Sequence, residues 1–439
     1  MEKITKLIED RLSPFAKKIS SNHYLMSISD GFEKLIPVTI IGAIFTLLST
    51  LQIEVYQNFI ANLNLDEILS FVPNVTLGMM ALYAVVFIGY SASKRFDLKE
   101  SSILVTGLSV ICFLLLIPLG IYEFSELGES VSVNAIRLRY LGASGLFTAM
   151  IVGLLVPKLY QFILKRKWVI ALPPSVPPGI RMAFQAILPM SMILFAFSLL
   201  RFVVSLTEFN SFNNLIFRFL QQPLMGLGAN PITFIILIFL TSLFFFFGIH
   251  GGQITNPFLS SIYIPLAIEN LEALQSGVDA SNLPHLIVQS NWFVYASIGG
   301  GGGTVGLVIL MFFFSKSTRY KTLSKPALPA TFCGMNEPIV FGLPIVLNPT
   351  TMIPFFITPI ITFIIGYLAT VAGIVPPLNG VQILPGTPII FSAWITGGIR
   401  VVILQVLLIA LQVLIYLPFF KVLDKQALLE EAADIKISY

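Results

Sequence analysis

The residues best suited to chemistry lie in one apolar stretch, 330–349, which reads A-T-F-C-G-M-N-E-P-I-V-F-G-L-P-I-V-L-N-P. Its only charged residue is Glu337, which follows Asn336. A carboxylate at membrane depth is costly unless it faces a cavity or a partner, so Glu337 is a candidate functional residue. It would accept hydrogen bonds from a polyol or take a proton from a hydroxyl. The alternative is a structural carboxylate that accepts hydrogen bonds from free backbone amides.

The same stretch is a poor continuous helix. Pro338 removes a backbone donor, and Gly342 and Pro344 follow within six residues. Non-helical backbone at membrane depth is tolerated only where it is buried in protein or lines water. We therefore predict a re-entrant hairpin that presents Asn336 and Glu337 to a polar cavity.

The composition places these residues in a membrane protein. Of 439 residues, 56% are hydrophobic and 11% are charged, against about 25% charged in soluble proteins. Apolar runs near twenty residues recur along the chain, which predicts an all-α polytopic membrane protein rather than an outer-membrane barrel. The three histidines are scattered and the two cysteines lie in apolar surroundings, so we expect no metal, no cofactor and no disulfide framework. The sequence has no basic patch interleaved with aromatic residues, so we expect no nucleic-acid partner.

The charges at the ends of the apolar runs predict the topology. By the positive-inside rule, the N-terminus, 94–100 and 165–181 are cytoplasmic, whereas 54–74 and 123–134 lie outside. Lysines near 316–325 and after 420 place both the hairpin entrance and the C-terminus in the cytoplasm. The segment 207–228 starts outside and residue 316 lies in the cytoplasm, so an odd number of crossings is needed between them. We therefore expect an additional short, broken crossing or hairpin within 249–285. The total is about ten spans.

Composition also predicts how the chain is divided. We expect an N-terminal amphipathic helix, a transmembrane scaffold or dimerisation domain, an interfacial linker, a substrate-binding transmembrane domain and a cytoplasmic tail. A solvated or disordered arm is the alternative for the first segment. The proline-rich stretch 172–179 is either a boundary or a stiff loop. The five parts are 1–30, 31–206, 207–230, 231–425 and 426–439.

Three interrupted segments occur in the second half: 250–257, 330–349 and 376–394. Transporters build substrate sites at interrupted helices, so we predict that the three converge on one cavity; ordinary kinks are the alternative. The five consecutive glycines Gly299–Gly303 allow a close backbone approach or a hinge. They lack the lysine of a nucleotide-binding loop.

Other candidate ligands lie in or near these segments. His250 is either a hydrogen-bonding or proton-handling partner of Glu337, or an interfacial histidine that caps a helix. Several side-chain amides are suited to bind sugar hydroxyls. Each could equally form hydrogen bonds with backbone groups that are left free where a helix is interrupted. Trp394 could stack on a sugar ring, although an interfacial aromatic belt is the commoner role. The amides are those of Gln253, Asn256, Asn291 and Asn336.

Three motifs together give the chain a family resemblance: H-G-G-Q-I-T-N-P at 250–257, G-M-N-E-P-I-V-F-G-L-P at 334–344 and L-P-P-S-V-P-P-G at 172–179. The whole chain resembles enzyme IIC, the membrane permease of the bacterial phosphoenolpyruvate-dependent phosphotransferase system, in its lactose/cellobiose/N,N′-diacetylchitobiose branch. The resemblance implies a homodimer in the cell membrane, with about ten spans and two re-entrant hairpins per subunit. It also implies that the permease presents a disaccharide's 6-hydroxyl to a phosphocysteine of IIB, which is charged by IIA, and it maps the family's glutamate and histidine onto Glu337 and His250.

Lactose permeases of this branch usually carry a fused IIB domain, whereas this chain ends about twenty residues after its last predicted span. We therefore expect a separate IIB protein, and cellobiose or N,N′-diacetylchitobiose as substrate. A proton-coupled sugar transporter with Glu337 and His250 as a relay is the main alternative. A membrane glycosyl- or lipid-modifying enzyme is a third hypothesis, but the loops contain no cluster of charged catalytic residues.

Overall fold

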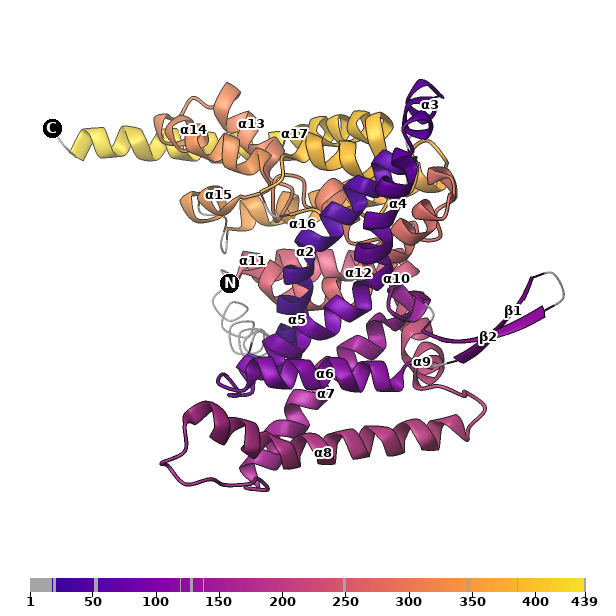
Figure 1. Cartoon of the computed structure of the whole chain (residues 1–439). Helices are drawn as coiled ribbons and strands as arrows, with labels where there is room; N and C mark the ends of the chain where they lie inside the picture. The colour runs from indigo at the N-terminus through magenta and orange to yellow at the C-terminus, as the bar shows by residue number, and fades with distance from the viewer. Residues whose placement is uncertain are drawn as a thin grey trace. The chain divides into compact units, whose positions relative to one another are not determined.

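The chain packs as two compact units, an N-terminal unit, Asn22–Gly226, and a C-terminal unit that begins at Leu227 (Figure 1). The amphipathic helix predicted for the N-terminus falls mainly on residues outside the described part of the chain. The residues described by the computed structural model are 18, 21–50, 54–118, 120–126, 129–136, 138–247, 250–343, 345, 348–384 and 386–437.

The N-terminal unit is mostly helical. The apolar runs predicted from the sequence appear as long helices, and the proline-rich stretch 172–179 connects two of them, α7 and α8, inside this unit. Its elements are α2 (His23–Thr50), α3 (Glu54–Asn62), α4 (Leu65–Thr76), η1 (Leu77–Met79), α5 (Met80–Arg95), α6 (Ser102–Leu116), β1 (Gly120–Glu126), β2 (Glu129–Ala135), η2 (Leu138–Tyr140), η3 (Ala143–Gly145), α7 (Leu146–Lys165), α8 (Pro178–Ser205), α9 (Phe212–Ile216), the π-helical turn η4 (Phe217–Gln221) and most of α10 (Gln222–Ala229).

Small residues let three helices of this unit approach closely. Ile88 of α5 is fully buried between Gly31 of α2 and Gly153 of α7. A Cβ added at Gly31 would lie 2.4 Å from Ile88 Cγ1, and one at Gly153 would lie 3.0 Å from Ile88 Cγ2. Membrane helices commonly associate in this way, because packing rather than hydrophobicity drives their contact in lipid.

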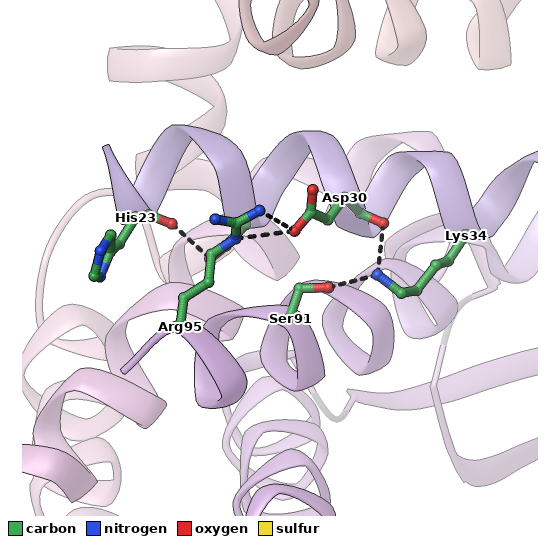
Figure 2. Close-up of polar contacts among 6 residues, drawn as sticks. His23, Asp30, Lys34, Ser91 and Arg95 are labelled. Carbon is green, nitrogen blue, oxygen red and sulfur yellow. Dashed lines mark hydrogen bonds and ion pairs between the residues drawn. The ribbon is translucent and has the colours of Figure 1, made fainter. Parts of the chain in front are cut away.

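A polar ladder closes one end of the α2–α5 contact (Figure 2). The Arg95 guanidinium donates twice to Asp30 Oδ2, at 2.9 Å from Nε and 2.6 Å from an Nη. Next to this ion pair, Lys34 Nζ donates to Ser91 Oγ at 2.9 Å and to the Asp30 carbonyl at 3.1 Å. These contacts fix the register of α2 against α5 at the end of α5 where basic residues gather.

The acidic segment 123–134, which was predicted to lie outside, belongs to an antiparallel hairpin. Strands β1 and β2 pair Tyr122 with Val133 and Phe124 with Val131. The alternating V-S-V pattern at 131–133 is typical of a strand. Among the described residues this hairpin is the one departure from an all-α fold.

The C-terminal unit is helical with two extended or glycine-rich interruptions. In Figure 1, α13 and α14 lie along α17. Its elements are α11 (Pro231–Phe246), α12 (Gly251–Gln275), η5 (Ala280–Asn282), the π-helical turn η6 (Trp292–Ala296), α13 (Val305–Phe314), α14 (Thr318–Phe332), α15 (Glu337–Gly342), α16 (Pro349–Val371) and α17 (Ile389–Ile437).

The all-α polytopic membrane fold is confirmed, whereas the total of about ten spans stays a prediction. Five helices in the described part of the chain are long and apolar enough to cross a membrane, or six if one bent helix pair counts as a single span. Several shorter helices accompany them. The five are Glu67–Arg95, Ala143–Lys165, Pro178–Ser205, Thr350–Val371 and Ile389–Ala432.

The segment 249–285, where an additional short, broken crossing or hairpin was expected, contains α12, which is neither short nor broken and is not among the described helices that are long and apolar enough to cross a membrane. α12 is a continuous helix of 25 residues, about 37 Å long at 1.5 Å per residue. The segment 250–257, expected to be interrupted, forms its start. Gly251 is needed there for contact rather than for a break, because an added Cβ would lie 2.1 Å from the Thr241 carbonyl oxygen of α11.

Candidate functional site

A helical hairpin of the C-terminal unit carries Asn336 and Glu337 at its tip. Its first arm, α14, ends in a turn at Gly334, which has a left-handed φ of 74° and whose amide donates to the Thr331 carbonyl at 2.9 Å. The second arm, α15, begins at Glu337. The predicted reversal is present, but both arms are helical, because Pro338 occupies an early position of α15 where a helix does not need its N–H.

The hairpin is fastened to the core of its unit by the second arm. Ile339 and Val340 are 0% and 2% exposed and pack in a cluster that includes Phe355 of α16 and Tyr416 of α17. Their amides donate to the Asn336 carbonyl at 2.9 Å each. The backbone at the tip is therefore held in place independently of any ligand.

The first arm is fastened at its start by carboxylates of α17. Asp424, 7% exposed, accepts hydrogen bonds from the amides of Lys316 at 3.0 Å and Ser317 at 3.2 Å. Glu431 accepts from the Arg319 amide at 2.8 Å and from the Ser317 hydroxyl at 2.6 Å. Negative side chains are favourable at a helix N-terminus, so α17 fixes the base of the arm that leads to Asn336.

Asn336 docks on the glycine loop Gly299–Gly303. Its side chain is 3% exposed, and Nδ2 donates to the Gly301 carbonyl at 2.6 Å. Gly300 lies directly beneath the amide: with φ of 93°, an added Cβ there would be 2.5 Å from Asn336 Cγ. Four of the five glycines have positive φ. The close-approach interpretation of this run is therefore the one the structure supports.

His250 approaches the same loop through an aromatic ring. The imidazole is exposed and lies against Phe245, with ring centroids 4.9 Å apart. The Phe245 ring also abuts the loop, since a Cβ added at Gly301 would be 2.8 Å from Phe245 Cε2. Gly252 lies beneath the imidazole, 3.3 Å from His250 Cε1 to an added Cβ. Gly300 and Gly301 thus contact both Asn336 and the aromatic support of His250.

The side chain of Glu337 lies outside the described part of the structure, and so does that of Gln253. Glu337 is the first residue of α15, and Gln253 lies in the first turn of α12. Asn256 follows on the second turn of α12 and is half-buried. The roles predicted for these three side chains stay predictions.

Asn291 is buried with both ends of its amide engaged locally. Its Oδ1 accepts from the Val288 amide at 2.7 Å, and its Nδ2 donates to the Leu286 carbonyl at 3.4 Å. The adjacent polar side chains differ. Gln289 Oε1 and Ser290 Oγ are buried without a hydrogen-bond partner. These two were missed from the sequence, although polar side chains at 289 and 290 inside an apolar run were a usable signal.

A second hairpin follows α16, in the segment 376–397. Its extended arm is joined to its helical arm by Asn379, whose amide donates to the Thr396 carbonyl at 2.9 Å. A break at Gly398, with φ of 71° and ψ of −164°, separates the helical arm from the rest of α17. Trp394 lies on this arm, 58% exposed. The proline-rich segment is therefore part of a packed hairpin rather than a kink in a helix.

Asn270 of α12 binds both this second hairpin and the segment that follows α12. Its Nδ2 donates to the carbonyls of Leu378 at 2.9 Å and His285 at 2.8 Å, and its Oδ1 accepts from the His285 amide. His285 Nε2 lies 2.7 Å from Glu269 Oε2. In the extended arm, Gln382 is 2% exposed, and its Nε2 has no hydrogen-bond partner.

Unpartnered buried polar groups are destabilising in a dry interior, so Gln382, Gln289 and Ser290 are candidate contacts for a polar ligand or ordered water. Tyr263 of α12 joins them, with a fully buried hydroxyl that has no partner. Within the described residues, no three His, Cys, Asp or Glu side chains are arranged to hold a metal ion.

Comparison with known proteins gives consistent matches along the chain. A family model, "Phosphotransferase system, EIIC", matches residues 29–359. The PTS system oligo-beta-mannoside-specific EIIC component of Bacillus subtilis (strain 168) is 32% identical and covers 97% of this chain and 95% of its own length. The PTS system cellobiose-specific EIIC component of Geobacillus stearothermophilus is 33% identical, with coverage of 100% and 98%. The crystal structure of the transporter ChbC, the IIC component from the N,N′-diacetylchitobiose-specific phosphotransferase system, matches with a TM-score of 0.90 and 33% identity over 97% of this chain and 99% of that chain.

Proposed function

Because the chain belongs to the EIIC family of the phosphotransferase system, we propose that it imports a disaccharide and presents its 6-hydroxyl to a phosphocysteine of a separate IIB protein. The resemblance inferred from the three motifs is confirmed at the family level, and the chain is a membrane-embedded sugar permease component. Cellobiose and N,N′-diacetylchitobiose are the substrates we favour, and a cellobiose-specific relative and the N,N′-diacetylchitobiose-specific ChbC, each 33% identical over nearly the whole chain, are consistent with this choice.

One observation supports the location of the chemistry: Asn336, next to Glu337, and the Phe245 ring beneath His250 both contact the glycine loop. The residues come from segments about 90 positions apart, and both segments pack on the same loop. A hairpin tip fixed in this way is suited to holding a sugar hydroxyl in one orientation, which is the main requirement for transfer to an external phosphodonor.

In the proposed reaction, the 6-hydroxyl oxygen attacks the phosphorus of the IIB phosphocysteine. A phosphorus–oxygen bond forms, the sulfur–phosphorus bond breaks, and the cysteine leaves as a thiolate. The hydroxyl proton passes to the Glu337 carboxylate, with His250 as a hydrogen-bonding partner that orients the hydroxyl. No nucleophile of the permease itself is required.

The remaining hydroxyls of the disaccharide require polar partners away from the phosphoryl-acceptor end. Asn256 and the unpartnered groups of Gln289, Ser290 and Gln382 are suited to this role, because sugar hydroxyls can both donate and accept hydrogen bonds. Trp394 is exposed on the second hairpin, where an aromatic face is available for stacking on a sugar ring. Gln253 and Asn291 stay weaker candidates, Asn291 because its amide is already engaged.

The N-terminal unit is proposed as the scaffold through which two subunits associate in the bacterial cell membrane, with both termini in the cytoplasm. Its tightly packed α2, α5 and α7 support a rigid scaffold. Cytoplasmic termini are favoured by Lys421 and Lys425, which are exposed near the end of α17. Cross-linking of single cysteines and labelling of the C-terminus from either side of the membrane test these two proposals.

A binding screen of the purified protein tests the proposed substrate. Isothermal titration with cellobiose, N,N′-diacetylchitobiose and lactose should give the tightest binding with one of the first two. A preference for lactose would overturn the substrate assignment. Sugar uptake into vesicles driven by a pH gradient alone, without IIB, would instead support a proton-coupled transporter.

A further inference from the structure

We infer that the glycine loop Gly299–Gly303 is a positioning element that fixes the Phe245–His250 pair and Asn336 relative to each other, with Tyr416 as its anchor. The inference rests on the proposed function for its catalytic consequence. The positioning of these side chains by the loop does not depend on which sugar is carried or on IIB.

The loop contacts the two site elements at neighbouring glycines. Gly300 lies against the Asn336 amide, and Gly301 both abuts the Phe245 ring and accepts the Asn336 hydrogen bond through its carbonyl. Phe245 in turn supports the His250 imidazole. Gly300 and Gly301 are adjacent residues, with Cα atoms about 3.8 Å apart. A shift of these two residues therefore displaces Asn336 and the Phe245–His250 pair together.

The opposite side of the loop is fastened to α16 and α17. The Tyr416 hydroxyl donates to the Gly302 carbonyl at 2.8 Å, and the ring is 1% exposed. A Cβ added at Gly302 would lie 2.2 Å from the Phe355 ring, and one at Gly303 would lie 2.9 Å from Gln412 Nε2. The loop is therefore clamped between these helices and the two site elements, without room for a methyl group at these positions.

Gly301 gives the cleanest test, because its φ is not positive and alanine is conformationally acceptable there. In Gly301→Ala, the added methyl group conflicts with the Phe245 ring at 2.8 Å. We expect kcat for sugar phosphorylation to fall about 10- to 100-fold, as for a misplaced reacting group, with an unchanged KM for IIB. Gly107→Ala is the matched control, because an added Cβ at Gly107 meets nothing within 4 Å.

A double-mutant cycle separates positioning from a general packing defect. If Gly301 acts through the ring, Gly301→Ala should have little further effect on kcat in a Phe245→Leu background. A full, additive effect in that background would overturn this route of action.

Histidine NMR gives a readout that needs neither IIB nor turnover. The chain has three histidines, His23, His250 and His285, so ring-labelled protein gives three signals, and His250→Gln assigns the one of interest. We expect Gly301→Ala, and also Tyr416→Phe, to shift the His250 signal alone. Tyr416→Phe keeps the ring volume, so it remains informative if Gly301→Ala folds poorly.

Unchanged His250 signals in both variants, or equal shifts of all three histidines, would overturn the inference. If the wild-type protein fails to support sugar phosphorylation but the His250 signal still responds to Tyr416→Phe, the proposed function fails and the positioning role stands.

Discussion

The hydrogen bond from Asn336 Nδ2 to the Gly301 carbonyl is the contact most open to a quantitative test. At 2.6 Å and with a side chain 3% exposed, it is a buried bond without competing bulk water. Asn336→Asp keeps the shape of the side chain but places a carboxylate oxygen against the carbonyl. Leaving a buried acceptor without its donor costs about 1–3 kcal/mol.

That loss should appear as local opening of the hairpin. The amides of Ile339 and Val340 donate to the Asn336 carbonyl, so they exchange with solvent only when the tip opens. A loss of about 1–3 kcal/mol corresponds to exchange about 5- to 140-fold faster at these amides. Hydrogen-exchange mass spectrometry of peptides spanning 333–343 measures this ratio directly.

The matched control is Asn230→Asp, the same substitution at the N-cap of α11. There Oδ1 accepts from the Ile232 amide at 2.9 Å, and aspartate caps a helix as well as asparagine does. We expect exchange rates in α11 to be nearly unchanged. Wild-type exchange in 333–343 of Asn336→Asp, or equal acceleration in the control, would refute the reasoning.

The remaining predictions concern the chemistry and the two anchoring networks. Glu337→Gln should abolish most sugar phosphorylation while leaving a folded protein with a wild-type elution volume, and His250→Ala should lower it less; near-normal phosphorylation would remove Glu337 from the mechanism. Asp30→Asn should lower the unfolding free energy of the N-terminal unit by about 1 kcal/mol, since the pair with Arg95 is partly exposed and screened; an unchanged denaturation midpoint would contradict this. Asp424→Asn should destabilise the start of α14 by about 1.5–3 kcal/mol, because a charged acceptor of backbone amides is lost; exchange rates at 316–320 measure it.

The sequence was most informative where a residue contradicts its surroundings. Glu337 in an apolar run with prolines predicted a hairpin tip at the right place, because both the charge and the missing N–H are costly in lipid. The prolines of 376–394 likewise predicted an interruption, and a hairpin lies at this place in the structure. Hydrophobic length gave the helical membrane fold, and the motifs around Asn336 and His250 gave the family.

The sequence was less informative where contacts between distant segments select a residue. Gly251 suggested a break, because glycine usually weakens a helix, but its close approach to Thr241 of α11 is what requires it. The glycine loop contacts Phe245, Asn336 and Tyr416, which are separated by up to about 170 positions. No local pattern encodes such partners, so only the choice between close approach and hinge was available.

The proposed function requires that the sugar reach the cytoplasm phosphorylated. The direct measurement uses proteoliposomes containing the purified protein, with phosphorylated IIB supplied on the side of the hairpin entrance and radiolabelled cellobiose or N,N′-diacetylchitobiose on the other. We expect the label to reach the IIB side as the 6-phosphate, and only when phosphorylated IIB is present. Accumulation of free sugar without IIB would contradict it.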